Sequence, residues 1–318
     1  MLRTRVPLGP SSGLILSALF AALFTVIGGA ELFVAEFAPT YGVPTPLVLR
    51  VPYGARIVRS GSGELFDVTF QHHRIVLPRG SVLQPGVEQH RAAIKYDSLH
   101  RPPSLTRLGS AFLLYFFGCF ILSNYFSRFG HPRLRLLRSQ LGVFVLMGFA
   151  LLLAKVLLVL TVLPAFWIPV SAVALWAVVG FDRRTAFLLD VAVSLIVASL
   201  LRFDLALLAV LVTRGMIASL LFLNRKQPRQ MVLAGLASGL GAAVAYLAMS
   251  VLLSGQTGIV GDLSLGFGSN IIACAGGGLV SGLLGLVMRE PAELALGHVS
   301  RGRLLDLTDI EAPLLREM

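Results

Sequence analysis

Eight apolar spans, arranged as one plus seven, dominate the pattern of hydrophobic and polar positions along the 318-residue chain. A stretch of about 20 mostly apolar residues is long enough to cross a bilayer as a helix. The pattern therefore predicts an all-α polytopic membrane protein with about eight transmembrane helices; a count of seven is the alternative, because two spans are short. The expected spans are Gly13–Phe37, Gly109–Phe126, Gln140–Leu160, Pro164–Gly180, Ala186–Leu201, Leu205–Leu223, Met231–Leu253 and Gly268–Met288.

A polar insert, residues 38–107, separates the first span from the other seven. Its short alternating runs, punctuated by turn residues, predict a small strand-rich domain between the first and second helices. An insert of this length forms only a marginal core by itself, so it is expected to pack against a second copy of the chain, the outer membrane face, or both. The expected elements are strands at Leu47–Val51, Ala55–Arg59, Leu65–Phe70 and Arg74–Leu77 and a short helix at Val87–Tyr96.

The pattern divides the chain into five segments. They are an N-terminal segment (1–12), the first transmembrane helix (13–37), the external domain (38–107), the seven-helix bundle (108–288) and a polar tail (289–318). The apolar stretch of the first span is longer than that of a signal peptide, so an uncleaved anchor is expected. In the tail, a helix is expected to restart at Pro291, because proline is favoured in the first turn of a helix.

The distribution of charge predicts the orientation of the chain in the membrane. Hydrophobic residues make up 56% of the chain and charged residues 14%, with a net charge of +11. The short loops on one side carry nearly all the basic residues, as cytoplasmic loops do under the positive-inside rule. Both termini are therefore expected in the cytoplasm, and the basic residues are expected to contact anionic lipid headgroups rather than nucleic acid.

Three ionisable residues lie inside expected spans, where charge is costly and such residues are candidates for function. Asp190 and Arg214 lie on adjacent antiparallel spans and are expected to pair. A structural ion pair, a ligand site and an ion pathway are all compatible with that arrangement. Lys155 lies towards the outer end of its span and is expected to extend its amine to the membrane interface.

Small residues recur at the spacing that allows two membrane helices to approach closely. Close packing is their expected role, and a hinge that moves during signalling is the alternative. These residues are Gly235, Gly239, Gly276, Gly277, Gly278 and Gly282.

The motifs of several enzyme classes are missing from the sequence. It has no His-Asp dipeptide, no Gly-Lys-Ser/Thr loop and no zinc-binding signature. The two cysteines, Cys119 and Cys274, both lie inside spans and do not indicate the compartment of the external domain. No catalytic residue, metal site or cofactor is therefore expected in this chain.

The polar tail carries the most specific motif. It reads Leu304-Leu305-Asp306-Leu307-Thr308-Asp309, followed by Ala312-Pro313-Leu314-Leu315-Arg316. This segment resembles the juncture that joins the last span to the hydrolase in the bacterial seven-transmembrane HD-domain phosphohydrolases. The order of one helix, an external domain and seven helices is similar to that of the family. Two shorter runs are also similar, Ile75–Gly80 in the external domain and Pro291-Ala292-Glu293 after the last span.

The sequence departs from the family pattern in three respects. The external domain of the family is usually much longer than this insert. Ala312 stands where the family commonly has a histidine before Pro-Leu-Leu. The HD hydrolase itself is absent, so none of its metal ligands can be assigned to a residue of this chain.

The resemblance implies a sensory and anchoring module of a bacterial inner membrane. An unidentified external ligand would act on the insert, and the bundle would regulate an HD hydrolase held in cis beyond the juncture. The family contains cyclic-di-AMP phosphodiesterases, and the resemblance is compatible with a homodimer. The competing interpretation is a small-molecule permease or the substrate-binding membrane subunit of a transporter, which would also have many apolar helices with glycines and a few buried charges.

Overall fold

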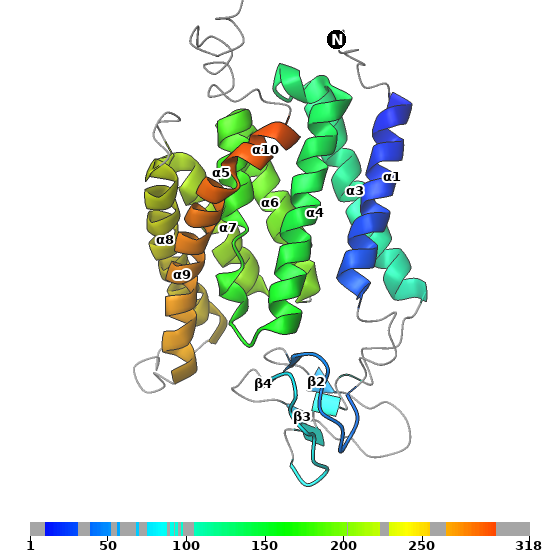
Figure 1. Ribbon diagram of the computed structural model, residues 1–318, viewed down its shortest axis with the longest axis vertical. Helices are drawn as coiled ribbons and strands as arrows, with labels where there is room; N and C mark the ends of the chain where they lie inside the picture. Colours follow the sequence, from blue (N-terminus) through cyan, green and yellow to red (C-terminus); the bar gives the residue numbers. More distant parts are fainter. Residues whose placement is uncertain are drawn as a thin grey trace, which may run out of the picture.

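The computed structural model describes residues 10–30, 39–51, 56–57, 68–69, 75–87, 90–91, 93–94, 97, 105–201, 203–222, 229–254 and 265–296. In these residues the protein is a helical bundle with short strands beyond one end (Figure 1). We call this the strand end, and the opposite end, where α1 begins and α10 lies, the α10 end. The juncture motif at 304–316 lies outside the described residues.

The helices follow the order of the expected spans, and their ends differ from the expected ones by a few residues. The described part of the first span ends sooner than expected, because residues 31–37 are not among those described. The short helix after the last span begins two residues before Pro291. The helices are α1 Pro10–Gly29, α3 Leu105–Arg128, α4 Leu137–Leu160, α5 Ser171–Gly180, α6 Arg183–Leu200, α7 Leu205–Leu221, α8 Arg229–Ser254, α9 Leu265–Val287 and α10 Arg289–Ala295.

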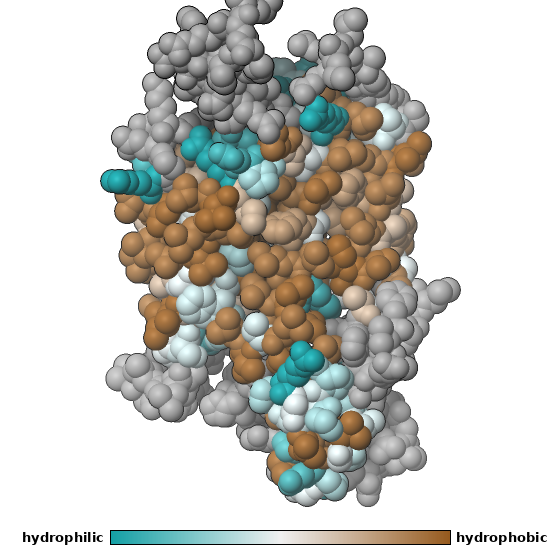
Figure 2. Space-filling view, in the orientation of Figure 1, coloured by the Kyte–Doolittle hydropathy of each residue, from teal (hydrophilic) through white to brown (hydrophobic). Residues whose placement is uncertain are grey.

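The bundle is that of a multi-pass membrane protein. Among the described residues, five helices are long and apolar enough to cross a bilayer, namely α1, α3, α4, α8 and α9. Large apolar side chains such as Ile121, Leu252 and Ile272 are exposed on their surfaces, and hydrophobic residues predominate across the middle of the face shown in Figure 2. The apolar helices that include α5 and α7 are shorter, so the expected number of eight spans is not confirmed.

The expectation of a continuous helix over Pro164–Gly180 is wrong. Helix α5 begins only at Ser171, and the preceding stretch, Thr161–Val170, is irregular except for the 3-10 turn η4 at Ala165–Trp167. We call this stretch the α4–α5 linker. Pro164 and Pro169 explain it, because proline lacks an N–H group and disfavours helical backbone at the residue before it. The second half of the linker is nonetheless inside the protein, since Phe166, Ile168 and Val170 are buried.

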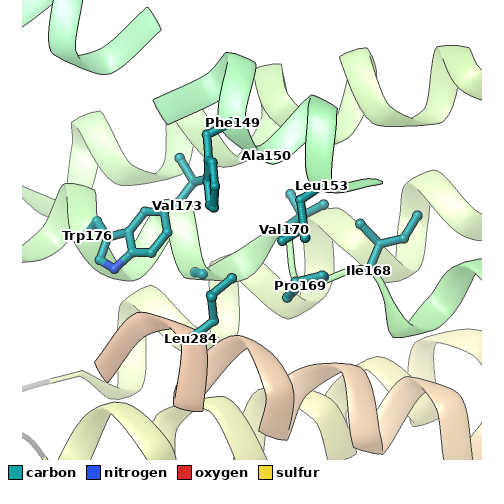
Figure 3. A pocket seen from close by; sticks show the side chains of 10 residues that line it. Phe149, Ala150, Leu153, Ile168, Pro169, Val170, Val173, Trp176 and Leu284 are labelled. Carbon is teal, nitrogen blue, oxygen red and sulfur yellow. The ribbon is translucent and has the colours of Figure 1, made fainter. Parts of the chain in front are cut away.

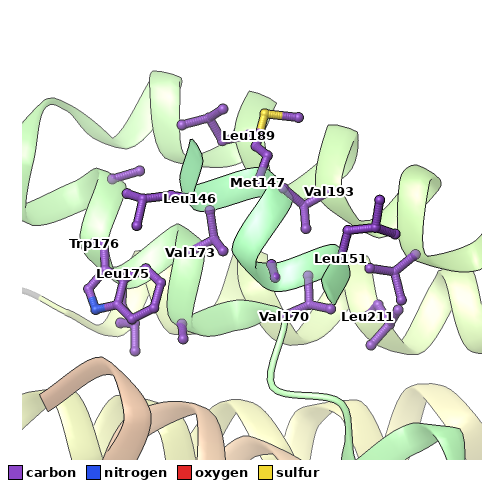
Figure 4. Close-up of a cluster of buried hydrophobic side chains, with 14 of the residues drawn as sticks. Leu146, Met147, Leu151, Val170, Val173, Leu175, Trp176, Leu189, Val193 and Leu211 are labelled. Carbon is purple, nitrogen blue, oxygen red and sulfur yellow. The ribbon is translucent and has the colours of Figure 1, made fainter. Parts of the chain in front are cut away.

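The core of the bundle lies where α4, α5, α6 and α7 meet (Figure 4). Lipid is as apolar as these side chains, so close packing and interhelical hydrogen bonds hold such a core together. The buried apolar residues labelled there are Leu146, Met147, Leu151, Val170, Val173, Leu175, Trp176, Leu189, Val193 and Leu211.

Helix α1 joins the bundle through aromatic contacts. The ring of Phe20 stacks on that of Phe144 of α4, with centroids 5.3 Å apart. Phe24 meets Tyr115 of α3 edge-on at 6.3 Å. Such ring pairs add about 0.5–1.5 kcal/mol beyond the area they bury, so α1 packs as part of the bundle.

The expected strand-rich domain is not confirmed. The described strands form only two short antiparallel pairs, β1 Leu49–Val51 with β4 Ile75–Leu77 and β2 Arg56–Ile57 with β3 Val68–Thr69. Each lies within one of the four expected strands, several of whose other residues lie outside the described part of the chain. The turn at Pro78-Arg79-Gly80 is present, and Gly80 adopts φ +85°, which glycine allows without steric cost. Part of the expected helix at Val87–Tyr96 lies outside the described residues.

Candidate functional site

The α4–α5 linker is held by Arg214, a fully buried residue of α7. Its Nη1 donates a hydrogen bond to the backbone carbonyl of Phe166 at 2.7 Å, and its Nη2 donates to the carbonyl of Ile168. A membrane interior offers no water to irregular backbone, so such backbone is tolerated only where the protein satisfies it. Arg214 therefore supplies the linker with donors that a continuous helix would not have needed.

Helix α9 makes room for this contact through two glycines. A Cβ atom at Gly277 would collide with the guanidinium of Arg214 and with the Phe166 carbonyl. A Cβ atom at Gly276 would collide with the indole ring of Trp167. The linker, the arginine and α9 therefore fit together only because these two positions lack side chains.

Asp190 of α6 lies against α7 beside Arg214. It is fully buried, and its carboxylate presses on Gly215, where a Cβ atom would collide with it. Neither carboxylate oxygen has a hydrogen-bond partner, and the structure contains no ion pair between Asp190 and Arg214. The structure thus places the two residues close together, but the guanidinium of Arg214 donates its hydrogen bonds to the linker and not to Asp190. Their coupling stays a prediction.

Two buried serines near this site were not singled out by the sequence. The hydroxyls of Ser171 on α5 and Ser194 on α6 have no hydrogen-bond partner. A serine in an apolar helix is usually a small packing residue, so its sequence context gives no signal. Only the surrounding structure distinguishes these two.

Lys155 binds the backbone of α1, and its expected extension to the membrane interface stays a prediction. Its amine donates to the carbonyl of Gly28 at 2.9 Å, at the last turn of α1. A cation is favourable at this end of a helix, where carbonyls lack partners within the helix. Lys155 therefore ties α4 to α1.

Arg50 of β1 makes an equivalent contact at the strand end, which sequence analysis missed. Its guanidinium donates to the carbonyls of Leu158, Thr161 and Leu163, at 3.0, 2.6 and 2.8 Å. These carbonyls belong to the last turn of α4 and the beginning of the α4–α5 linker. The backbone N–H of Val48 adds a bond to the carbonyl of Val159 at 3.1 Å. We call the described residues between 39 and 87, which include β1 to β4, the strand segment. Arg50 and Val48 thus attach it to the end of α4 and to the linker that Arg214 also binds.

The remaining candidate glycines lie where α8 contacts α9. A Cβ atom at Gly235 would lie 2.6 Å from the carbonyl oxygen of Gly278, and one at Gly282 would lie 2.8 Å from that of Met231. Gly239 faces Ala275 and Gly278 at similarly short distances. The two backbones are therefore in direct contact, as the small-residue spacing predicts for packed membrane helices.

At the α10 end, α10 folds back on the bundle. A Cβ atom at Gly142 of α4 would collide with the carbonyl of Ala295, and one at Gly180 would lie 2.9 Å from Leu296. Arg289 and Glu293 form a salt bridge of 2.8 Å within the helix. The Pro291-Ala292-Glu293 run thus lies in a helix that rests on α4 and α5.

A crevice runs between α4, α5, the linker and α9 (Figure 3). The residues that line it are apolar, and Phe149 is partly exposed. The labelled residues are Phe149, Ala150, Leu153, Ile168, Pro169, Val170, Val173, Trp176 and Leu284. Across the described part of the chain, no group of three or more His, Cys, Asp or Glu side chains is placed to hold a metal ion.

Comparison with known proteins gives one match. The model of the family described as "7TM receptor with intracellular HD hydrolase" matches residues 105–286, more than half of the chain. No curated protein and no solved structure matches the chain. The matched region runs from α3 to α9 and contains Asp190, Arg214 and the glycine contacts.

We predict that Gly278→Ala lowers the stability of the bundle, because the added methyl group meets backbone that cannot move aside. Overpacking typically costs about 1–3 kcal/mol. Gly268→Ala is the matched control on the same helix, where a Cβ atom would meet nothing within 4 Å. Thermal unfolding of both purified variants, followed by circular dichroism, makes the comparison. Equal stability of the two variants would contradict the packing role.

We also predict that Asp190 and Arg214 are energetically coupled. When Asp190 is ionised, neutralising Arg214 leaves its carboxylate without a countercharge in the membrane, where charged groups cost about 2.5–3.5 kcal/mol on insertion scales. Asp190→Asn combined with Arg214→Gln should therefore give more folded protein than the worse single variant. Size-exclusion chromatography of the three variants quantifies the folded fraction. Additive losses would show that the residues act independently.

Proposed function

Because the chain belongs to the family of 7TM receptors with an intracellular HD hydrolase, we propose that it is a sensory and anchoring module. In this proposal it responds to an external signal and regulates a cytoplasmic HD-type phosphohydrolase that cleaves a cyclic dinucleotide. The family match over residues 105–286 carries the proposal. Catalysis would reside in the HD domain, which supplies metal ions that activate water and neutralise charge on phosphate, and this chain would contribute no catalytic residue.

The proposed topology has eight crossings in a bacterial inner membrane, with both termini in the cytoplasm. A ten-residue helix such as α5 is only about 15 Å long, but the α4–α5 linker precedes it at membrane depth and extends the crossing. Exposed arginines gather at the α10 end, as cytoplasmic loops require. They are Arg128, Arg133, Arg135, Arg138, Arg183 and Arg184.

A continuous set of contacts supports a route for the signal. Arg50 binds the carbonyl of Leu163 at the start of the linker, and Arg214 binds the carbonyl of Phe166 three residues later. Arg214 and Trp167 in turn touch α9 at Gly277 and Gly276. Helix α10 follows α9 directly and rests on α4 and α5. A displacement of the strand segment would therefore move the linker, then α9, and finally the segment that leads to the hydrolase.

The test of this route is Arg50→Ala in the chain joined to an HD hydrolase domain of the family. Without Arg50 the strand segment loses three bonds to α4 and the linker, so hydrolysis of cyclic di-AMP in membrane vesicles should change several-fold. Arg79→Ala is the matched control, because Arg79 is an exposed arginine in the same segment. Hydrolysis that changes equally in both variants, or in neither, would contradict the route through Arg50.

We predict that residues 255–261 and Met318 lie on opposite sides of the membrane. Helix α8 ends and α9 begins at the strand end, whereas α10 lies at the opposite end of the bundle (Figure 1). Alkaline phosphatase, which is active outside the cytoplasm, and a fluorescent reporter that matures inside it can be fused at each site. A phosphatase signal from the loop and fluorescence from the C-terminal fusion are expected. The same side for both would refute the eight-crossing topology.

A further inference from the structure

Five polar side-chain atoms in the bundle interior have no hydrogen-bond partner among the described residues. They are Ser171 Oγ, Asp190 Oδ1 and Oδ2, Ser194 Oγ and Arg214 Nε. All four residues are fully buried. Burying an unsatisfied polar group is costly, and such groups in a native protein call for a partner such as water, an ion or a proton.

These atoms belong to one region of the fold. Helices α5, α6 and α7 pack on one another in pairs. Asp190 and Ser194 lie one turn apart on the same face of α6, and Asp190 presses on Gly215, the neighbour of Arg214. Ser171 begins α5 three residues after Ile168, whose carbonyl Arg214 binds. The unpartnered groups therefore lie on three helices that pack against one another, and one of them, Arg214, also binds the linker.

The two serines differ from other serines in the helices of this protein. A buried helical serine normally donates its hydroxyl proton to the carbonyl four residues earlier. Ser17, Ser219 and Ser281 do so, with oxygen–oxygen distances of 2.7–2.8 Å. The hydroxyls of Ser171 and Ser194 make no such bond, and they are available to another partner.

Asp190 is the decisive group. An ionised carboxylate in a membrane interior needs donors or a countercharge, and here it has neither in contact, because both Nη atoms of Arg214 bind the linker. The arrangement fits a neutral carboxylic acid. We propose that Asp190 is a proton-binding site in the membrane core and that the structure represents its protonated form.

The same geometry defines what happens when the proton leaves. The carboxylate of Asp190 then becomes the strongest acceptor within reach of Arg214, and Gly215 places no side chain between them. The guanidinium would turn from the Phe166 and Ile168 carbonyls to Asp190, since a charged acceptor binds about twice as strongly as a neutral one. Loss of the proton therefore releases the linker, and Trp167 with it, from the surface of α9.

Few other groups can account for a response to pH in this region. Helix α5 has no titratable side chain, and α7 contributes Arg214 alone. On α4, Lys155 binds Gly28 near the strand end, and Arg138 is exposed at the α10 end. On α9, the thiol of Cys274 is buried. On α3, the phenol of Tyr115 is bonded to Ser199 of α6 at 2.6 Å.

Tryptophan fluorescence reports the environment of Trp167, which belongs to the linker. The chain has two tryptophans, so Trp176→Phe leaves Trp167 as the only one. In nanodiscs of uncharged lipid, emission from Trp167 is expected to shift to longer wavelength along a single titration curve as the pH rises. Adding Asp190→Asn should abolish this shift. Asp182→Asn is the matched control on the same helix. Asp182 caps the N-terminus of α6, and asparagine caps a helix as well as aspartate does, so this variant should leave the shift unchanged.

Each other outcome overturns the proposal. Emission that stays constant with pH would mean that the site holds only structural water. A shift that persists in Asp190→Asn assigns the titration to another group, such as Cys274. Emission that follows sodium at constant pH would show a metal-ion site instead.

A second measurement covers the case in which Asp190→Asn does not fold. Wild-type protein labelled with ¹³C on its aspartate side chains should show a protonated carboxylic acid by infrared spectroscopy at neutral pH, where ordinary aspartates are ionised because their pKa is about 4. A spectrum with ionised carboxylates alone would refute the proton site. Neither measurement uses the hydrolase, so their outcome is independent of the proposed enzyme partner.

Discussion

The arrangement of the bundle depends on a requirement that lipid imposes on irregular backbone: every carbonyl and N–H group within the membrane must find a partner in the protein. Pro164 and Pro169 break the helix that would have met this requirement automatically. Arg214 meets it from inside the bundle and Arg50 from the strand end. Three features follow from this break in the helix. They are the burial of Arg214, the glycines at 276 and 277 of α9, and the contact of the strand segment with the linker.

This dependence explains why the site could be predicted only in part. Asp190, Arg214 and Lys155 stand out in the sequence because charge is rare inside apolar spans. The partners of Arg214 and Lys155 are backbone carbonyls, which every residue possesses, so no sequence pattern marks them. For the same reason Arg50 resembles any exposed arginine of a polar insert. Ser171 and Ser194 become noticeable only when the hydrogen bonds of other serines are known.

The fold, like the site, could be predicted only in part: the sequence predicts its repeated features but not the structure of the linker. Long apolar runs and glycine spacing predict the helices and the α8–α9 contact, because each is a repeated feature of the chain. The prolines at 164 and 169 were visible, yet an apolar stretch with prolines is also compatible with a kinked helix. Whether such a stretch bends or unwinds is decided by a donor on α7, far away in the sequence. Alternation also predicts the position of the short strands, since each described strand lies within an expected one.

The contacts of α1 and the strand segment with α4 impose an order on biosynthesis. The bond from Lys155 to Gly28 joins residues separated by 127 positions, and a ribosome adds about 5–20 residues per second. Helix α1 therefore waits on the order of ten seconds in the bilayer before its partner arrives, and the strand segment waits nearly as long for the end of α4. During that interval neither α1 nor the strand segment has its contact with α4. Both are then exposed to proteases and to non-native contacts with other proteins.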